Sequence, residues 1–293
     1  GLSLSYNTPV HMSAALFQYM YDAQGGTYLD AYNNIPHVGH SHPAITEAAV
    51  KQLRKLNTNT RYLYNSYADY TENLLSLFPS NLNKAMLVNS GSEASDLATR
   101  MAKTVTGKQG MAVLKWSYHG NTQNGINISS YKFDRKGGKG AQDWILRLPL
   151  PKAYNGSHTT AEGYFTEAKK MIEDFESKGN QLAGFIAEPI SGCGGQVPLM
   201  DGYLKLLVPY LKQKGILVII DEVQTGFGRL GKWFWGFEMH DIVPDMVVLG
   251  KPIANGHPMG ALVTTAAITD AFNNGMEFFS SFGGNPVSCE AAK

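Results

Sequence analysis

The stretches ILVIIDE (216–222) and DMVVLGK (245–251) decide the fold. Each is a short run of β-branched and other apolar residues that leads to a charged side chain, Asp221 in the first and Lys251 in the second. Continuous apolar runs of this length are typical of strands that are buried on both faces of a parallel sheet. The two stretches therefore predict two strands of an α/β domain, each with a polar group at its end.

Strand-like and helix-like stretches alternate along most of the chain. Further apolar runs lie at residues 85–88, 111–115, 182–188 and 261–267. Amphipathic stretches with helical spacing lie at residues 44–56, 92–105, 167–178 and 203–214. This alternation predicts a mostly parallel sheet with helices on both faces. We expect residues 1–43 to form an N-terminal arm, residues 44–293 to form one large domain, and residues 134–160 to form a long loop.

The composition fits a globular protein with a sizeable core. The chain has 293 residues, of which 43% are hydrophobic and 17% are charged, which is enough for one large domain or two small ones. Its net charge of +1 does not favour a nucleic acid or an anionic membrane as a partner. No apolar run approaches the roughly 20 residues that a membrane-spanning helix needs. The two cysteines suit a reducing compartment.

The two ends of the chain lead to further expectations. The first residues, GLSLSYNTPVHM, lack the basic start and the apolar stretch of a signal peptide. We therefore expect a cytoplasmic protein, with the mitochondrial matrix as the alternative. The last residues, NPVSCEAAK, resemble the opening of a helix, and we expect further sequence beyond them.

Polar, glycine-rich segments directly follow the expected strands. They are NSGSEAS (89–95), WSYHGN (116–121), EPISGCGG (188–195), DEVQTGFGR (221–229) and GKPIANG (250–256). In open α/β sheets, ligands bind beyond the carboxyl ends of the strands. We therefore expect one site to gather these segments.

Two of these segments suggest sites for charged groups. Ser90 and Glu93 have the spacing of a helix cap, and the free N–H groups of such a helix start bind anions. An ordinary cap with no ligand is the alternative. Asp221 follows a buried run, where a carboxylate needs a cation or hydrogen-bond donors. A protonated pyridine nitrogen would satisfy it, and so would backbone amides or Arg229.

Two other residues suggest a planar carbonyl compound as the ligand. Lys251 would attack a carbonyl if it lay in a partly dry pocket, and a solvated lysine is the alternative. Tyr118 would stack on a planar ring, and a core tyrosine is the alternative. An anion-binding helix start, an aromatic ring, a carboxylate and a lysine are together the groups that pyridoxal 5′-phosphate (PLP) requires. The sequence therefore predicts PLP as the cofactor.

Residues 219–251 closely resemble the signature of class III (ornithine/GABA-type) aminotransferases. They read IIDEVQTGFGRLGKWFWGFEMHDIVPDMVVLGK, and Asp221 and Lys251 are 30 positions apart, as in that family. The motifs NSGSEA, YHGN, AEPI and FGGNP also match, so the resemblance runs from about residue 9 to the end of the chain. It implies the PLP-dependent transferase type I fold with a seven-stranded sheet. The family's small C-terminal domain is expected to be absent here.

The resemblance also implies which residues hold the cofactor. Gly91 and Ser92 would bind its phosphate. Tyr118 would stack on the ring and His119 would support it. Asp221 would pair with the ring nitrogen and would be one of two catalytic residues.

Further roles around the ring follow from the same resemblance. Lys251, the other catalytic residue, would form the Schiff base. Val223 would press on the second ring face, Gln224 would approach the phenolic oxygen, and Glu188 would lie beside the substrate. Members of the family are homodimers with active sites at the interface. In them a Thr before FGGNP reaches the partner's cofactor phosphate, and Ser281 occupies that position here.

A narrower likeness leaves two activities open. HVGHSHP, LNTNTRYLYNSY, ISSYKF and SGCGGQ resemble the branch that contains ethanolamine-phosphate and phosphohydroxylysine phospho-lyases. The main hypothesis is amino transfer between an amine or amino acid and a keto acid. The alternative is elimination of phosphate from an O-phosphorylated amino alcohol or amino acid. Under that alternative Arg61 is the candidate cation for the substrate phosphate, and a purely structural role is its competing interpretation.

Two other classes of function are disfavoured. A non-catalytic nucleotide-binding module would carry a GxxxxGK[ST] loop, which the sequence lacks, or a GxGxxG that opens a helix after the first strand, and no GxGxxG stands at that position. His37, His40 and His42 are close together, but no fourth ligand with metal-site spacing follows. We interpret them as a turn before a helix, and we predict no metal.

Overall fold

A seven-stranded sheet forms the centre of the computed structural model, which describes residues 4–293. Its strand order is β4-β12-β11-β10-β7-β5-β6. The strands are β4 (Lys84–Val88), β5 (Gly110–Leu114), β6 (Ile145–Leu148), β7 (Leu182–Ala187), β10 (Leu217–Asp221), β11 (Met246–Leu249) and β12 (Gly260–Thr264). Only β12 runs against the others, because it pairs antiparallel with both β11 and β4. The prediction of a mostly parallel sheet of seven strands is confirmed.

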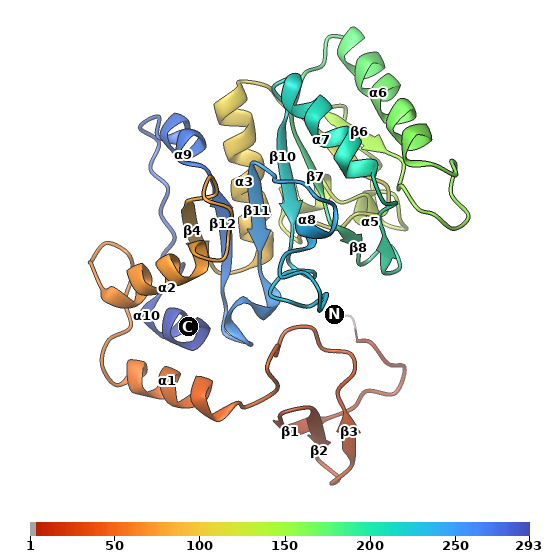
Figure 1. The fold of residues 1–293 in the computed structure, drawn as a ribbon. Helices are drawn as coiled ribbons and strands as arrows, with labels where there is room; N and C mark the ends of the chain where they lie inside the picture. The colour runs from red at the N-terminus through yellow and green to blue at the C-terminus, as the bar shows by residue number, and fades with distance from the viewer. Residues whose placement is uncertain (1–3) are drawn as a thin grey trace.

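Helices cover both faces of this sheet (Figure 1). One face packs against α2 (Asn65–Leu75), α6 (Ala161–Ser177), α7 (Tyr203–Gln213) and α8 (Gly236–Met239). The other face packs against α3 (Gly91–Thr106), α4 (Gln123–Asn127), α5 (Ser130–Phe133) and α9 (Ala266–Phe272). In β10 the side chains alternate between the two cores, with Val218 and Ile220 in the first and Ile219 in the second. This alternation explains why the strand is apolar throughout.

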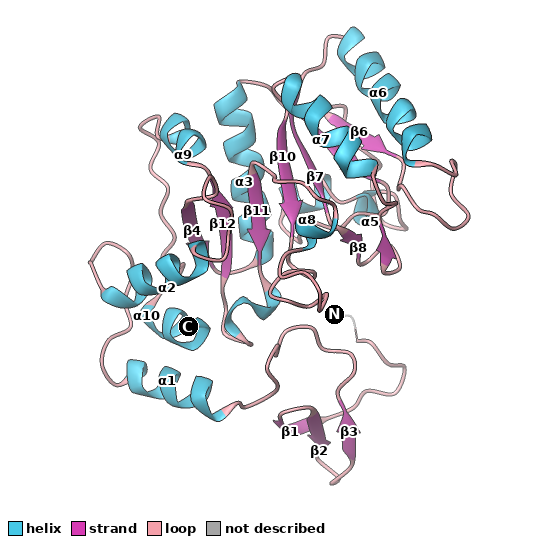
Figure 2. Cartoon of the chain, viewed as in Figure 1, coloured by secondary structure: helices cyan, strands magenta, loops and turns pink. Residues whose placement is uncertain are grey.

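The first part of the chain forms a small sheet of its own, which the sequence did not lead us to expect. It contains β1 (Met12–Leu16), β2 (Tyr19–Asp22) and β3 (Thr27–Leu29), joined antiparallel, and it lies apart from the central sheet (Figure 2). Oδ1 of Asp22 accepts hydrogen bonds from the N–H groups of Gln24 and Gly26. Such a side-chain bond to the following backbone stabilises the turn between β2 and β3.

Four short or terminal elements complete the fold. They are α1 (Pro43–Leu53), which packs on α10 (Pro286–Ala292), and β8 (Ile190–Ser191), which pairs with β9 (Val197–Pro198). The strand β11 leads into the 3-10 helix η1 (Lys251–Ala254). None of the helices within residues 4–293 is long and apolar enough to cross a membrane.

Three expectations about individual elements were wrong. Residues 134–160 are not a continuous loop, because β6 lies within them. The short run of β6 is interrupted by the exposed Arg147, which forms an ion pair with Asp134, and this polar position hid the strand. Residues 265–267 do not extend β12, because Thr265 caps α9 through a hydrogen bond from the Ile268 N–H. Lys251 lies two residues beyond the last residue of β11 and begins η1.

Candidate active site

The segments that follow the strands meet in one pocket with a volume of about 320 Å³. This is at the lower end of the range of about 300–1,000 Å³ that is usual for small-molecule sites. Its lining contains every predicted site residue except Arg61 and Ser281. The predicted residues that line the pocket are Gly91, Ser92, Tyr118, His119, Glu188, Asp221, Val223, Gln224 and Lys251.

The start of α3 forms one wall of the pocket. The hydroxyl of Ser90 accepts a hydrogen bond from the Glu93 N–H at 3.2 Å and so caps the helix. The Glu93 carboxylate turns back to accept the N–H of Asn89 at 3.1 Å. The first N–H groups of a helix have no partner inside it, so Gly91 and Ser92 bring such groups to the pocket wall. Together with the helix dipole they form a site that favours an anion.

Two glycines allow three chain segments to approach one another closely at this wall. A Cβ atom on Gly91 would lie 2.7 Å from Cγ2 of Val223, which is too close for real atoms. A Cβ atom on Gly250 would lie 3.0 Å from both the Cα and the N atom of Gly91. A larger residue at Gly91 would therefore press the helix start against the loop after β10, and a larger residue at Gly250 would press the segment after β11 against the helix start.

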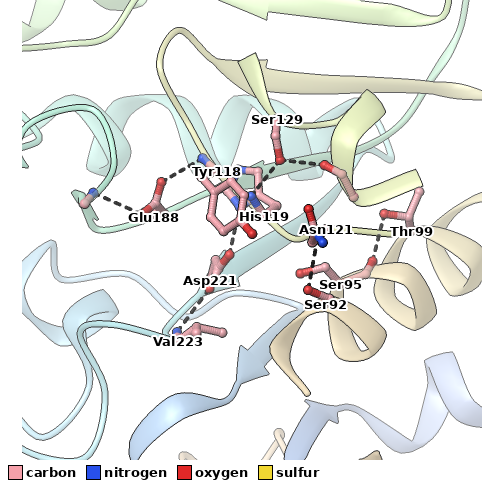
Figure 3. A network of polar contacts seen from close by, with 12 residues as sticks. Ser92, Ser95, Thr99, Tyr118, His119, Asn121, Ser129, Glu188, Asp221 and Val223 are labelled. Carbon is pink, nitrogen blue, oxygen red and sulfur yellow. Dashed lines mark hydrogen bonds and ion pairs between the residues drawn. The ribbon is translucent and has the colours of Figure 1, made fainter. Parts of the chain in front are cut away.

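Asp221 and His119, which both line the pocket, form a buried pair (Figure 3). Nδ1 of His119 lies 2.8 Å from Oδ2 of Asp221, and Oδ1 of Asp221 accepts the Val223 N–H at 3.1 Å. Asp221 is 4% exposed and His119 is 2% exposed. Arg229, which the sequence offered as an alternative partner of Asp221, instead donates to the carbonyl oxygen of Asn34.

Glu188 connects two of the loops that build the pocket. Its Oε1 accepts the N–H of Tyr118 and its Oε2 accepts the N–H of Gly192, both at 3.0 Å. Burial is the main reason why the pKa of Glu188 is raised, to about 7, and the negative charge of Asp221 adds to this effect. Glu188 thus fixes the backbone that carries Tyr118, besides presenting its carboxyl group to the pocket.

Lys251 stands on a strained piece of backbone. Its φ angle is +41°, in the left-handed region that non-glycine residues rarely adopt. Such strain persists only where the surrounding structure enforces it, and it is common at functional sites.

The half-buried Tyr118 lines the same pocket, and its ring and the ring of Tyr131 pack edge to face at a centroid distance of 6.1 Å.

Arg61 and Ser281 lie outside this pocket. Ser281 is exposed. The exposed Arg61 forms an ion pair with Glu277 at 3.4 Å, and its guanidinium carbon lies 4.2 Å from the ring centroid of Phe279. Their predicted roles towards substrate and towards a second subunit stay predictions.

The three clustered histidines have separate partners in the fold. Nε2 of His37 lies 2.6 Å from the carbonyl oxygen of Phe227, and Nε2 of His40 lies 2.6 Å from the carboxylate of Asp30. The ring of His42 packs edge-on against Phe17. These contacts agree with the interpretation of a turn before α1.

Sequence reasoning missed part of the lining and one central contact. Ile35, Ser95 and His257 also line the pocket. Ser95 lies one helical turn after Gly91, and this spacing could have identified it. The contact between His119 and Asp221 has no local signal, because 102 positions separate the two residues.

Comparison with known proteins identifies the family of this chain. Residues 4–293 match the family described as aminotransferase class III. The chain belongs to the class III aminotransferase family. The predicted family and the PLP-dependent transferase type I fold are therefore confirmed.

Two relatives within the class III family carry different activities in their names. One is alanine–glyoxylate aminotransferase 2-like from Drosophila melanogaster, 39% identical over 94% of this chain. The other is ethanolamine-phosphate phospho-lyase homolog 1 from Caenorhabditis elegans, 37% identical over 97% of this chain. The chain spans 58% and 64% of the lengths of these two relatives.

Solved structures of class III enzymes show the same fold. A phospholyase from Arthrobacter in complex with phosphoethanolamine is 37% identical, with a TM-score of 0.93 over 99% of this chain and 69% of that one. An (S)-enantioselective omega-transaminase from Thermomicrobium roseum is 26% identical, with a TM-score of 0.87 over 98% of this chain and 68% of that one.

Proposed function

We propose that this chain is the cofactor-binding part of a PLP-dependent aminotransferase, which transfers an amino group between an amine or amino acid and a keto acid. One observation carries the proposal: Lys251, the Asp221–His119 pair and the helix start at Gly91 line a single pocket. Membership of the class III family supports it. The arm at residues 1–43 and the large domain at 44–293 are part of the same proposal.

The pocket residues fit PLP in shape and in chemistry. The N–H groups of Gly91 and Ser92 suit its phosphate, and the absence of a Cβ atom on Gly91 leaves room beside Val223. Within the described residues, the buried hydroxyl of Ser95 faces this pocket without a hydrogen-bond partner. Asp221 offers a carboxylate to a protonated ring nitrogen.

Tyr118, Val223 and Gln224 surround the remaining space. Tyr118 and Val223 offer surfaces for the two faces of a flat ring, and Gln224 offers an amide to its phenolic oxygen. Asn34 donates to Oε1 of Gln224 at 3.4 Å and helps to orient it. Glu188 also lines the pocket, and the proposal assigns it a position beside the substrate.

Each pocket residue has a separate chemical role in this proposal. PLP supplies an aldehyde that condenses with amines and a ring that withdraws electrons. Lys251 would hold the cofactor through its side-chain amine, and that amine would accept the proton from the substrate carbon that bears the amine and, in amino transfer, would deliver it to the cofactor carbon. Asp221 stabilises positive charge at the ring nitrogen, and His119 keeps Asp221 in place.

Phosphate elimination is the second candidate activity. It is favoured by the 37% identity and the TM-score of 0.93 with the Arthrobacter phospholyase in complex with phosphoethanolamine. The two activities differ in what they consume and release. An aminotransferase consumes one keto acid for each amine converted. A phospho-lyase releases inorganic phosphate and ammonia from phosphoethanolamine without any keto acid, and this assay decides between them.

We further propose a cytoplasmic homodimer with shared active sites, with the mitochondrial matrix as the alternative location. The exposed positions of Ser281 and Arg61 fit residues that serve a site completed by a second subunit. One relative is named alanine–glyoxylate aminotransferase 2, mitochondrial, from Homo sapiens. Light scattering of the purified protein tests the dimer, and cell fractionation tests the location.

A further inference from the structure

We propose that Lys132 holds the anionic end of the substrate, whether a phosphate or a carboxylate. This inference rests on the proposed function. Lys132 lies in α5, and its Nζ is 5.5 Å from the centroid of the Tyr118 ring. Tyr118 lines the pocket and Lys132 itself does not, so this ammonium group lies beside the ring of a residue that faces the ligand.

The ammonium group of Lys132 is free to accept a ligand. Within residues 4–293 it forms no ion pair and no side-chain hydrogen bond, although the side chain is half buried. Its known neighbour is the Tyr118 ring, and an attraction between a cation and an aromatic ring leaves the ammonium donors available. A half-buried cation without an acid partner favours the binding of an anion.

The charges of Lys132 and Lys251 both act on Cys193. Burial raises the pKa of the Cys193 thiol and the negative charge of Glu188 raises it further, whereas the charges of Lys251 and Lys132 both lower it. Both ammonium groups therefore lie within electrostatic reach of Cys193. The proposal places the reacting amine of the substrate near Lys251 and its anionic end near Lys132.

The charges of the pocket favour such a cation for an anionic substrate. Asp221 lines the pocket and its carboxylate repels an anion. Two arginines lie away from Tyr118 within this subunit. Arg61 is paired with Glu277 outside the pocket, where it would serve the site of a second subunit, and Arg229 donates to the carbonyl oxygen of Asn34. Lys132 is the cation next to Tyr118 that keeps its donors.

The test compares three variants of the whole chain loaded with PLP. Lys132→Gln removes the charge, Lys132→Arg keeps it, and Lys139→Gln removes the same charge from an exposed position a few residues away. Reaction with phosphoethanolamine, β-alanine and butylamine gives a KM for a phosphate, a carboxylate and a neutral end. Line broadening of the ³¹P signal of inorganic phosphate measures anion binding without turnover.

We expect the loss of the Lys132 charge to change the KM only of substrates that have an anionic end. Lys132→Gln should raise the KM for phosphoethanolamine, β-alanine or both by about 10- to 100-fold, as loss of a charge-assisted hydrogen bond implies. The KM for butylamine should not change, phosphate line broadening should fall, and Lys132→Arg should restore both. The anionic substrate that is affected more identifies the group that Lys132 binds.

Other results would overturn the role of Lys132. One such result is that Lys132→Gln equals Lys139→Gln in every KM and in phosphate binding. Another is that Lys132→Gln raises the KM for all three substrates equally. Loss of cofactor absorbance in both Lys132 variants would assign Lys132 to the pocket framework instead. A wild-type chain that takes up no PLP would end the proposed function itself, whereas normal cofactor absorbance with unchanged KM values would end only this inference.

Discussion

Nδ1 of His119 lies 2.8 Å from Oδ2 of Asp221, and the two residues come from distant parts of the chain. His119 follows Tyr118 in the loop after β5, and Asp221 is the last residue of β10. The pair connects the loop that carries Tyr118 to the end of β10. A buried carboxylate without a partner is costly, so this contact explains how Asp221 is accommodated at the end of an apolar strand.

Replacement of His119 tests this link. His119→Ala leaves Asp221 with the Val223 N–H as its remaining hydrogen-bond donor, and we expect the free energy of unfolding to fall by about 1–3 kcal/mol. PLP binding should weaken as well. His119→Asn retains an N–H donor and should recover part of both losses. Urea denaturation and titration with PLP measure them, and an alanine variant indistinguishable from wild type would contradict the account.

Substitution of Gly91 tests the close approach of the helix start to Val223. Gly91→Ala places a methyl group 2.7 Å from Cγ2 of Val223, and we expect a loss of stability of about 1–3 kcal/mol together with weaker PLP binding. In the double variant with Val223→Ala, the space is restored and the two effects should be less than additive. Thermal denaturation of all four proteins gives the coupling, and strict additivity would show that the two residues do not compete for space.

The raised pKa of Glu188 predicts a pH dependence of stability. Its pKa is about 7 in the folded chain, against an ordinary value of 4.5. Protonated Glu188 therefore favours folding, and this contribution is complete below about pH 4.5 and is lost as the pH rises through about 7. Glu188→Gln cannot titrate. Its free energy of unfolding should fall less than that of wild type between about pH 5 and about pH 8.

Glu222 also contributes to the pH dependence of stability, so Glu188→Gln should remove only part of this dependence. Burial also raises its pKa to about 7, so a residual pH slope should persist in Glu188→Gln. Urea denaturation at the two pH values measures the slopes. Equal slopes in the variant and in wild type would show that Glu188 is charged in the folded protein.

Replacement of Arg61 tests whether this residue binds substrate or has only a structural role. Arg61→Ala should raise the KM of an anionic substrate and leave PLP binding intact. Glu277→Gln is the matched control, because it breaks the same exposed ion pair and keeps the cation. Exposed pairs contribute at most about 1 kcal/mol, so neither variant should unfold at a clearly lower urea concentration. Unchanged kinetics in Arg61→Ala would remove the substrate role.

Much of the sheet was predictable because its strands are buried on both faces. The runs before Asp221 and Lys251 are short and apolar, which is typical of strands in a parallel sheet. The strand β6 was missed because Arg147 interrupts it, and β1 to β3 were missed because they bury little surface. Short, partly exposed strands depend on tertiary pairing and leave a weak pattern in the sequence.

The members of the pocket were easier to predict than their contacts. The rule that ligands bind beyond strand ends selected the segments around Gly91, Tyr118 and Asp221. It could not distinguish Asp221 from its neighbour Glu222, which is fully buried and accepts the N–H groups of Gly236 and Phe237 instead. Contacts between residues far apart in the sequence depend on how the loops pack, and a single sequence carries no record of this.

The most direct test of the central claim is to locate the lysine that carries the cofactor. The purified chain is incubated with PLP, its visible spectrum is recorded, the linkage is fixed with borohydride, and the labelled peptide is sequenced. The account predicts a visible absorbance band that borohydride abolishes and a label on Lys251 alone. A label on a different lysine, or no label at all, would contradict it.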